Sequence, residues 1–324
     1  MSYPKKLSVF QARFLNHLAY VLLAIAVLGA GCQSTAPGSV VPGTSTPTLG
    51  QTVASNVSST ALTPIKADVF LPRDVLATLG SPETASPTKR CAQAAGARAG
   101  LVNHHTLAAP LMADFFSELK HCRPEARTFI VLSPDHFQQA QAPIIITRRP
   151  YLTRGSQVKA DEQGVARLLA QVPDSREQDA AFDDEHGLGA VVPFLAAAYR
   201  PAEITLVPVM VNQHLTQTQA QGLSNWLKQE MASGTLVVVS ADMSHYQNRA
   251  VALENDVLTR RAFATGDAEF FWTAGDGYTD SGKTLWSVLQ ALKNASWHEL
   301  AHSISTNYGG DPANTTSYVT GFWE

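Results

Sequence analysis

Runs of consecutive aliphatic residues alternate along the chain with segments whose apolar residues recur every three or four positions. The runs 129–132 (FIVL), 206–211 (LVPVMV) and 236–239 (LVVV) are apolar throughout, which is typical of strands buried on both faces. The segments 218–234 and 280–295 instead place their apolar residues on one helical face. This alternation predicts an α/β fold, a single three-layer α/β/α domain with a mainly parallel central sheet.

Weaker patterns complete the series of elements. The segment 106–120 is predicted to be helical because Leu107, Leu111, Phe115 and Leu119 recur every four residues. Further strand-like runs lie within 100–105 and 142–149, and further helix-like segments at 164–172, 183–199 and 250–265.

Polar residues, histidine among them, stand where these strand-like runs end. The run within 100–105 ends at Asn103, His104 and His105, and the run 129–132 is followed by Asp135 and His136. The run 236–239 is followed by Ser240, Asp242 and His245, and the run 206–211 by Asn212 and His214. In an open α/β sheet, ligands bind outside the carboxyl ends of the strands. We therefore expect His104, His136 and His245 to converge on one crevice, although they are far apart in the sequence.

Histidine suits two kinds of chemistry at such a place. Its imidazole is the commonest metal ligand, and it titrates near neutral pH as a general base. Two or three imidazoles with one carboxylate or thiolate would hold a divalent metal with an open position. His105 and His214 fit a supporting position at the site and an ordinary surface position equally well, and His121 fits the end of a helix.

The stretch 182–187 (FDDEHG) adds Glu185 and His186 ahead of a predicted helix. Acidic residues in a first helical turn are favoured by the helix dipole, which explains the carboxylates without a site. The dipole gives no such support to a histidine. We therefore interpret His186 as a site residue, with Glu185 beside it.

The segment 298–302 (HELAH) matches the H-E-x-x-H pattern of zinc peptidases. That chemistry needs a helix, which places both histidines on one face, and a third ligand downstream. The following sequence SISTNYGG favours strand and turn instead, and no histidine comes after His302. On a strand, His298 and His302 would stand about 13 Å apart, so we expect both to lie outside the site.

Composition and charge set limits on the partners. A chain of 324 residues with 45% hydrophobic and 16% charged residues can bury one large core or two modest ones. Its formal net charge of −3 gives no reason to expect a nucleic acid as partner. A small-molecule substrate or an unidentified protein are the partners that remain.

The N-terminus has the features of a lipoprotein export signal. Basic residues precede the apolar run 18–31, and small residues lead into Cys32. The run is shorter than the roughly 20 residues of a membrane span. We expect a lipid on Cys32 to anchor an extracytoplasmic protein to the membrane of a bacterial cell envelope; an uncleaved N-terminal anchor is the alternative.

The domain boundaries follow from this signal. Residues 1–31 are the predicted signal peptide, and 32–65, rich in Ser, Thr, Pro and Gly, form a flexible tether. Residues 66–324 form the α/β domain. Apart from Cys32, Cys91 and Cys122 remain as a pair, which an oxidising compartment could bridge.

The motifs, taken in order, resemble those of the Memo-like family, known in prokaryotes as AmmeMemoRadiSam system protein B. The similarity spans roughly residues 66–324, from "ADVFLPRD", which resembles the opening "AGSWYPAD", to the last strand "SYVTGFWE". "LVNHH" stands where the family has an aliphatic strand and "APHAG", and "FIVLSPDH" resembles "IFILGPSH". "FDDEHG" is similar to "DEDEHS", and "VVVSADMSHY" to "FVVSSDFCHW".

The resemblance implies a fold and a set of site residues. The family shares its fold with class III extradiol ring-cleaving dioxygenases. Its two metal-site histidines fall on His104 and His136, and Asp242 and His245 also carry over. The family's cysteine ligand falls on Ser281, whose hydroxyl is a poorer ligand than a thiolate, so weak or absent metal binding is one expected outcome.

The leading functional hypothesis is an exported, metal-dependent oxidoreductase of the non-haem iron type. Iron is the expected metal, with zinc or copper as alternatives. In this hypothesis His104, His136 and Ser281 are metal ligands, His245 is a general base assisted by Asp242, and Glu185 and His186 border the site. A non-catalytic binding or scaffold protein that keeps the crevice, and a zinc hydrolase, are the alternatives.

Overall fold

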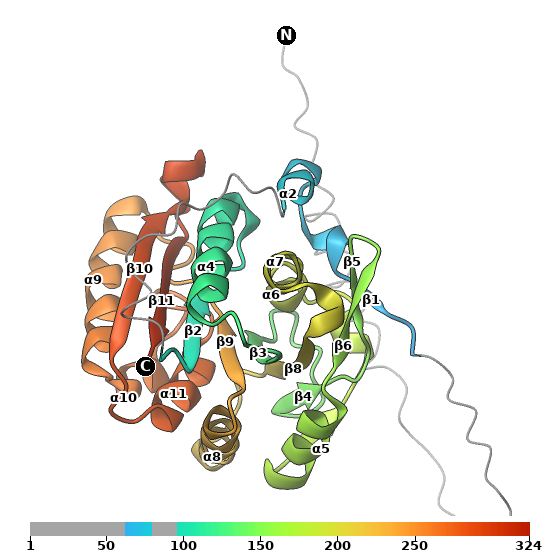
Figure 1. Ribbon diagram of the computed structural model, residues 1–324. Helices are drawn as coiled ribbons and strands as arrows, with labels where there is room; N and C mark the ends of the chain where they lie inside the picture. Colours follow the sequence, from blue (N-terminus) through green and yellow to red (C-terminus); the bar gives the residue numbers. More distant parts are fainter. Residues whose placement is uncertain (1–61, 80–95) are drawn as a thin grey trace, which may run out of the picture. The chain divides into compact units, whose positions relative to one another are not determined.

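The computed structural model describes residues 62–79 and 96–324 (Figure 1). The predicted signal peptide, Cys32 and nearly all of the tether lie outside this part of the chain, so the expectations about them stay predictions. Within the described residues, no helix has the length and apolar character needed to cross a membrane.

Strands of the described part form one sheet in the order β1-β5-β6-β8-β3-β9-β2-β11-β10, with β4 joined to β8 and β7 to β4. Their bounds are β1 (Ile65–Lys66), β2 (Ala99–Val102), β3 (Thr128–Pro134), β4 (Ile144–Ile146), β5 (Tyr151–Thr153), β6 (Ser156–Ala160), β7 (Ser175–Glu177), β8 (Thr205–Val211), β9 (Leu236–Ser240), β10 (Trp297–Ile304) and β11 (Ser317–Trp323).

The centre of this sheet is parallel, as the aliphatic runs predicted. The neighbouring pairs β8–β3, β3–β9 and β9–β2 are all parallel, whereas β11 is antiparallel to both β2 and β10. Because β3, β9 and β2 are adjacent and run in the same direction, their carboxyl ends lie side by side at one edge of the sheet.

Helices cover the sheet on both faces (Figure 1). Their bounds are α2 (Arg73–Thr78), α4 (Ala109–Cys122), α5 (Glu162–Gln171), α6 (His186–Gly189), α7 (Val192–Tyr199), α8 (Gln217–Ala232), α9 (Arg249–Thr265), α10 (Ala268–Thr273) and α11 (Gly282–Ala291), and short 3-10 turns are η1 (Ala67–Phe70), η3 (Thr106–Ala108), η4 (Ala180–Phe182), η5 (Pro201–Glu203) and η6 (Ser305–Tyr308).

The two large hydrophobic cores of the described residues lie one on each face of the sheet, and a third, small cluster contains Ala108, Leu111 and Tyr318. Along β3, Phe129 and Val131 belong to the core that includes residues of α4 and α7, while Ile130 and Leu132 belong to the core that includes residues of α8 and α11. Successive side chains of a strand point to opposite faces, so a strand covered on both faces must be apolar at every position. The three-layer α/β fold is thus confirmed.

Two details differ from the sequence-based expectation. Leu107 is not part of the buried face of helix α4; it lies in the preceding turn and is 38% exposed. The hairpin β5–β6 was missed because β5 has only three residues and β6 is mostly polar. Its turn residues Arg154 and Gly155 have the positive φ angles of 48° and 74° that tight hairpins favour.

Candidate functional site

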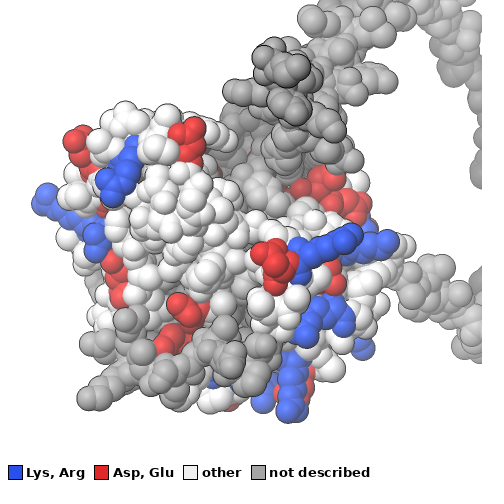
Figure 2. Space-filling model, turned by 90° about the horizontal axis from the view of Figure 1, so that it is seen from above, with Lys and Arg blue, Asp and Glu red and all other residues white. Residues whose placement is uncertain are grey.

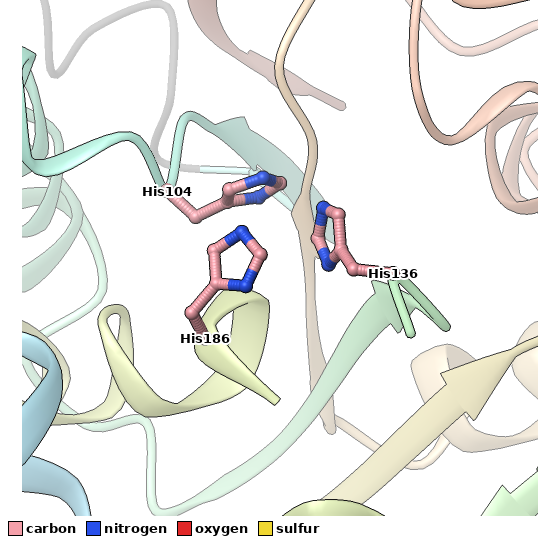
Figure 3. A group of neighbouring side chains, drawn as sticks. All are labelled: His104, His136 and His186. Carbon is pink, nitrogen blue, oxygen red and sulfur yellow. The ribbon is translucent and has the colours of Figure 1, made fainter. Parts of the chain in front are cut away.

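Three histidines from distant parts of the sequence face one another at the carboxyl edge of the sheet (Figure 3). His104 comes two residues after β2, His136 two residues after β3, and His186 begins helix α6. Their ring centroids are 4.7 Å apart for His104 and His136, 5.3 Å for His104 and His186, and 4.0 Å for His136 and His186. The adjacent strand ends therefore bring together residues that the sequence had placed at the site.

A carboxylate that sequence reasoning missed lies among these histidines. Asp280 Oδ2 is 3.1 Å from His104 Nε2, 3.5 Å from His136 Nε2 and 3.9 Å from His245 Nε2. Asp280 stands in the loop before α11, next to Ser281, and it follows no strand. Its only sequence signal was this position beside the residue aligned with the family's cysteine.

The other ring nitrogen of each histidine is held by a separate partner. Ser240 Oγ donates its proton to the carbonyl of Gly187, at 2.6 Å, so it must accept from His104 Nδ1, at 3.0 Å. The Nδ1 of His136 is 2.6 Å from Glu185 Oε1, and the Nδ1 of His245 is 2.6 Å from the Met243 carbonyl oxygen. These contacts direct all three Nε2 atoms toward Asp280.

Glu185 holds the loop that carries His136. Its buried carboxylate accepts hydrogen bonds from the backbone N–H of His136, at 3.1 Å, and from that of Gly187, at 2.7 Å, in addition to the imidazole contact. Glu185 thus sits behind His136 and fixes its orientation. The expectation that Glu185 takes part in the chemistry of the site stays a prediction.

Asp242 lies between two of the histidines. It accepts a hydrogen bond from the backbone N–H of His104, at 3.1 Å, and its Oδ2 is 3.7 Å from His104 Nε2 and 3.9 Å from His245 Nε2. The geometry allows Asp242 to balance a charge on either imidazole. The roles of His245 as general base and of Asp242 as its partner remain predictions.

Ser281 contacts the site through its neighbour. Its buried hydroxyl donates to Asp280 Oδ1, at 2.7 Å, while Asp280 Oδ2 faces the histidines. The position aligned with the family's cysteine therefore supports a carboxylate, and the adjacent Asp280 supplies the negative charge. A direct ligand role for Ser281 stays a prediction.

The carboxylates control the protonation of the two central histidines. Burial lowers the pKa of His104, but the negative charges of Asp242 and Asp280 outweigh it, and the pKa is raised. For His136, burial is likewise outweighed by the close contacts of its ring nitrogens with the carboxylates of Asp280 and Glu185, and the pKa rises to about 10. Burial opposes ionisation of Asp280, yet the neighbouring histidines hold its pKa well below the usual range.

The pKa of His186 shifts in the opposite direction. Burial and the positive charges of His136 and His104 lower its pKa to about 2. Glu185 Oε1 is 3.8 Å from His186 Nδ1, farther than Asp280 Oδ2 is from His104 or His136. His186 is therefore neutral at pH 7 and presents a half-exposed imidazole at the outer side of the site.

The donor atoms present fit a divalent metal ion. Two groups have ligand atoms within 4.8 Å of one another, namely His104 with His136 and His186, and His104 with Asp242 and Asp280. His136 Nε2 is buried, yet among the described residues it has no hydrogen-bond partner of ordinary geometry. Imidazole nitrogens and carboxylate oxygens around such an atom are ligands that iron, zinc and copper all accept.

Two further polar residues at the strand ends have a structural explanation. Asn103 donates to the carbonyl of His105, at 3.3 Å, and so holds the loop that carries His104. Asp135 accepts from the backbone N–H groups of Gln139 and Ala140, both at 3.0 Å. Both side chains therefore fix loops beside the candidate ligands.

The remaining histidines of the described part have other surroundings. His298 and His302 lie on strand β10, as expected, and face different carboxylates: Glu324 at 3.3 Å and Asp256 at 2.7 Å. The helix that a zinc peptidase needs at this motif is thus not formed. His105 bonds to Tyr318 Oη, at 2.7 Å, and lies next to the site without belonging to either group of candidate ligands.

The charge pattern of the surface is mixed. On the face seen in Figure 2, most of the described surface carries no ionic side chain, and acidic and basic residues are interspersed.

Fold and site together define an α/β protein with a histidine–carboxylate centre at the carboxyl edge of a mainly parallel sheet. The family model described as Memo-like protein matches residues 84–317. The chain therefore belongs to the Memo-like family, which confirms the resemblance seen in its motifs.

Relatives in other organisms agree with this assignment. A MEMO1 family protein of Caldivirga maquilingensis is 26% identical over 220 residues, covering 65% of this chain and 77% of the relative. A MEMO1 family protein of Thermotoga neapolitana is 23% identical over 228 residues, covering 68% of this chain and 81% of the relative. The crystal structure of an uncharacterized protein from Escherichia coli K12 has a TM-score of 0.50 at 14% identity, covering 68% of this chain and 98% of that one, and it supports the fold alone.

Proposed function

We propose that this Memo-like protein is an exported, metal-dependent oxidoreductase whose metal ion is held by His104, His136 and Asp280. The observation that carries the proposal is the convergence of both Nε2 atoms on Asp280 Oδ2, at 3.1 and 3.5 Å, with His136 Nε2 otherwise unpartnered within the described residues. Two histidines and one carboxylate that leave coordination positions open are typical of non-haem iron(II) enzymes.

The choice of metal follows from the ligand type. A thiolate is a soft ligand that suits copper(I) and zinc, whereas a carboxylate is harder and suits iron(II) and manganese(II). Asp280 therefore favours iron over the alternatives zinc and copper. A bound iron ion would supply binding positions for substrate oxygens and for dioxygen.

The surrounding residues would position the substrate and move protons. The Nδ1 atom of His245 donates to the Met243 carbonyl. Its Nε2 atom is therefore the ring nitrogen that can accept a proton. Asp242, 3.9 Å from His245 Nε2, would balance the resulting positive charge. The neutral His186 can donate or accept one hydrogen bond at the outer side of the site.

Export is supported by two observations. The sequence of residues 1–32 has the features of a lipoprotein signal. In addition, Cys122, at the end of α4, is disulfide-bonded, which is usual for proteins of oxidising compartments. We propose that the domain works at the outer face of a bacterial membrane.

One observation favours a second candidate, a binding protein without catalysis. The raised pKa values of His104 and His136 mean that these two protonated imidazoles can balance most of the negative charge of the three neighbouring carboxylates without a metal. Such an ion-pair network would keep the site ordered in a protein that never holds an ion.

Metal content distinguishes these functions. The protein is purified without oxygen and without metal-chelating resins, and its iron, zinc and copper are measured by mass spectrometry beside a His104→Ala, His136→Ala double variant. About one iron per chain in the parent and almost none in the variant is the expected result. Stoichiometric zinc would favour the hydrolase, and a parent that stays empty after incubation with each metal would favour the binding protein.

A further inference from the structure

Exposed apolar side chains are concentrated in two parts of the described chain. Leu107, Phe137 and Tyr246, which are 38%, 41% and 74% exposed, lie in the segments that follow β2, β3 and β9, each within three residues of a site histidine. Leu62 and Val69, 45% and 69% exposed, lie shortly before and shortly after β1. These residues, here called the apolar rim, are five of the seven large hydrophobic residues exposed in the described part.

Helix α6 connects the two parts of the apolar rim. At its start, the ring of His186 is 5.8 Å from the ring of Phe137. At its end, Gly189 packs against the turn η1, where an added Cβ atom would clash with the ring of Phe70, the neighbour of Val69. The apolar rim therefore extends from the site histidines to the point where the predicted tether meets the domain.

The loops of the apolar rim next to the site carry no ionic side chains. Residues 105–107, 137–142 and 246–248 contain no Asp, Glu, Lys or Arg. Charged groups are costly to bring into an apolar environment, so their absence lowers the cost of placing these loops against one. Near Val69, the exposed Lys66 and Arg73 have long apolar stems that let their charges stay in a polar layer.

The predicted membrane anchor determines which apolar surface lies within reach of this rim. About 30 residues separate Cys32 from Leu62, and a flexible chain of that length has an r.m.s. end-to-end distance of about 30 Å. This is less than the diameter of a domain of about 260 residues, whose radius of gyration is about 18 Å. The tether enters beside the apolar rim, because the carbonyl of Thr63, just before β1, accepts a hydrogen bond from Arg149 Nε at 2.7 Å.

We propose that the apolar rim docks on the lipid bilayer to which the N-terminus is anchored. Phe137 and Val69 reach the acyl chains in this arrangement, as the apolar side chains of interfacial proteins do. Tyr246 stays among the headgroups, where tyrosine is enriched, because the exposed Asp276 lies beside His245, whose N–H donates to the Asp276 carbonyl at 2.8 Å. The choice of a bilayer as partner rests on the proposed export, whereas the position of the docking surface rests on the apolar rim alone.

The test places tryptophan reporters at the docking surface. Phe137→Trp and Tyr246→Trp are compared with Val257→Trp, which is a matched reporter at an exposed apolar position of α9. The full chain is inserted by its own N-terminus into phosphatidylcholine–phosphatidylglycerol vesicles and treated with EDTA, so that bound metal does not affect the emission. Acyl chains brominated near the headgroup or deeper in the bilayer serve as quenchers, and the emission of the five native tryptophans, measured in the parent, is subtracted.

We expect the Phe137→Trp emission to shift to shorter wavelength and to be quenched by bromine at both depths. The Tyr246→Trp emission should be quenched mainly by bromine near the headgroup, and the Val257→Trp emission by neither. Adding Val69→Ser and Phe137→Ser to Tyr246→Trp should lower the ratio of docked to undocked domain at least about tenfold, since each apolar side chain withdrawn from water contributes roughly tenfold. The matched change Val257→Ser with Leu258→Ser should leave the quenching as it was, and melting temperatures check that each variant is folded.

Three results would overturn the inference. The first is a Phe137→Trp emission quenched no more than that of Val257→Trp, and the second is unchanged quenching after Val69→Ser with Phe137→Ser. The third is a dimer in detergent solution that Phe137→Ser dissociates, because a second copy would then cover the apolar rim. Failure of the proposed function looks different: a chain without an acyl group or without metal uptake whose Phe137→Trp emission is still quenched keeps the docking surface and loses only the lipid anchor or the metal.

Discussion

At the scale of single residues, the site depends on the orientation of a few side chains. Three imidazoles reach Asp280 Oδ2 with the same ring nitrogen, Nε2, because a hydroxyl, a carboxylate and a backbone carbonyl each bind the Nδ1 atom. Such outer contacts fix the tautomer and the direction of the lone pair, and their loss typically lowers metal affinity by about 10- to 100-fold. Glu185 is the charged member of this set.

Replacing Glu185→Ala should destabilise the fold and weaken metal binding together. The change leaves the N–H groups of His136 and Gly187 and the Nδ1 of His136 without their acceptor, and buried unsatisfied donors cost about 1–3 kcal/mol each. We expect the free energy of unfolding in urea to fall by about 3 kcal/mol. The adjacent exposed Asp184→Ala is the control and should stay within about 0.5 kcal/mol of the parent; equal effects of the two changes would contradict the account.

At the scale of elements, the site is assembled by three parallel strand ends and one helix start. The strands β2, β9 and β3 supply His104, His245 and His136, and the loop before α11 supplies Asp280. That loop is closely packed. A Cβ atom on Gly282 would lie 2.6 Å from the carbonyl oxygen of Phe271 and 3.0 Å from that of Ala274.

Gly282→Ala should therefore disturb the site although it removes no ligand. The atoms in the way are backbone atoms, so the start of α11 must shift, and such overpacking costs about 1–3 kcal/mol. We expect a lower melting temperature and, because Asp280 and Ser281 move with the helix, weaker iron binding. Gly275→Ala in the same loop meets no atom within 4 Å and should leave both quantities unchanged. A Gly282→Ala protein with normal stability and affinity would refute this view of the loop.

The strands and loops of the site also show which of its residues could be predicted from the sequence. Consecutive aliphatic residues followed by His104, His136 or His245 predicted both the strands and the edge at which they end, because parallel strands end on the same side. Asp280 could not be found in this way, since it follows no strand. Which of Asp280 and Ser281 faces the histidines depends on the conformation of one irregular loop, and no periodicity encodes that. The similarity to the family pointed to Ser281, one residue away.

At the scale of the whole molecule, the Memo-like domain is combined with an N-terminal segment of different character. The family match covers residues 84–317, and the motifs extend the similarity to the last strand. The basic and apolar segment before Cys32 and the tether that follows would place this domain outside the cytoplasm, at a membrane. An iron site there would meet an oxidising environment, which also suits the disulfide at Cys122.

We predict that Cys32 is the N-terminus of the mature protein and that it carries lipid. The physical reason is the order of a basic segment, an apolar run too short to span a membrane and small residues before the cysteine. Mass spectrometry of protein purified from the native membrane should show a chain that begins at residue 32 with added acyl mass. In a Cys32→Ser variant this mass should be absent and the membrane fraction depleted. A mature chain that begins after Cys32, or carries no acyl group, would contradict the prediction.

The central claim is that Asp280 completes a metal site with His104 and His136. The most direct measurement is the affinity for iron(II), titrated without oxygen against a competing chelator, in the parent, Asp280→Asn, Ser281→Ala and the exposed control Asp276→Asn. We predict that Asp280→Asn weakens binding at least about tenfold, or by about 1.4 kcal/mol, because an amide lacks the negative charge of the ligand. Ser281→Ala should have a smaller effect and Asp276→Asn none. If Asp280→Asn binds iron as tightly as the parent, or if the parent binds none, the account of this site is wrong.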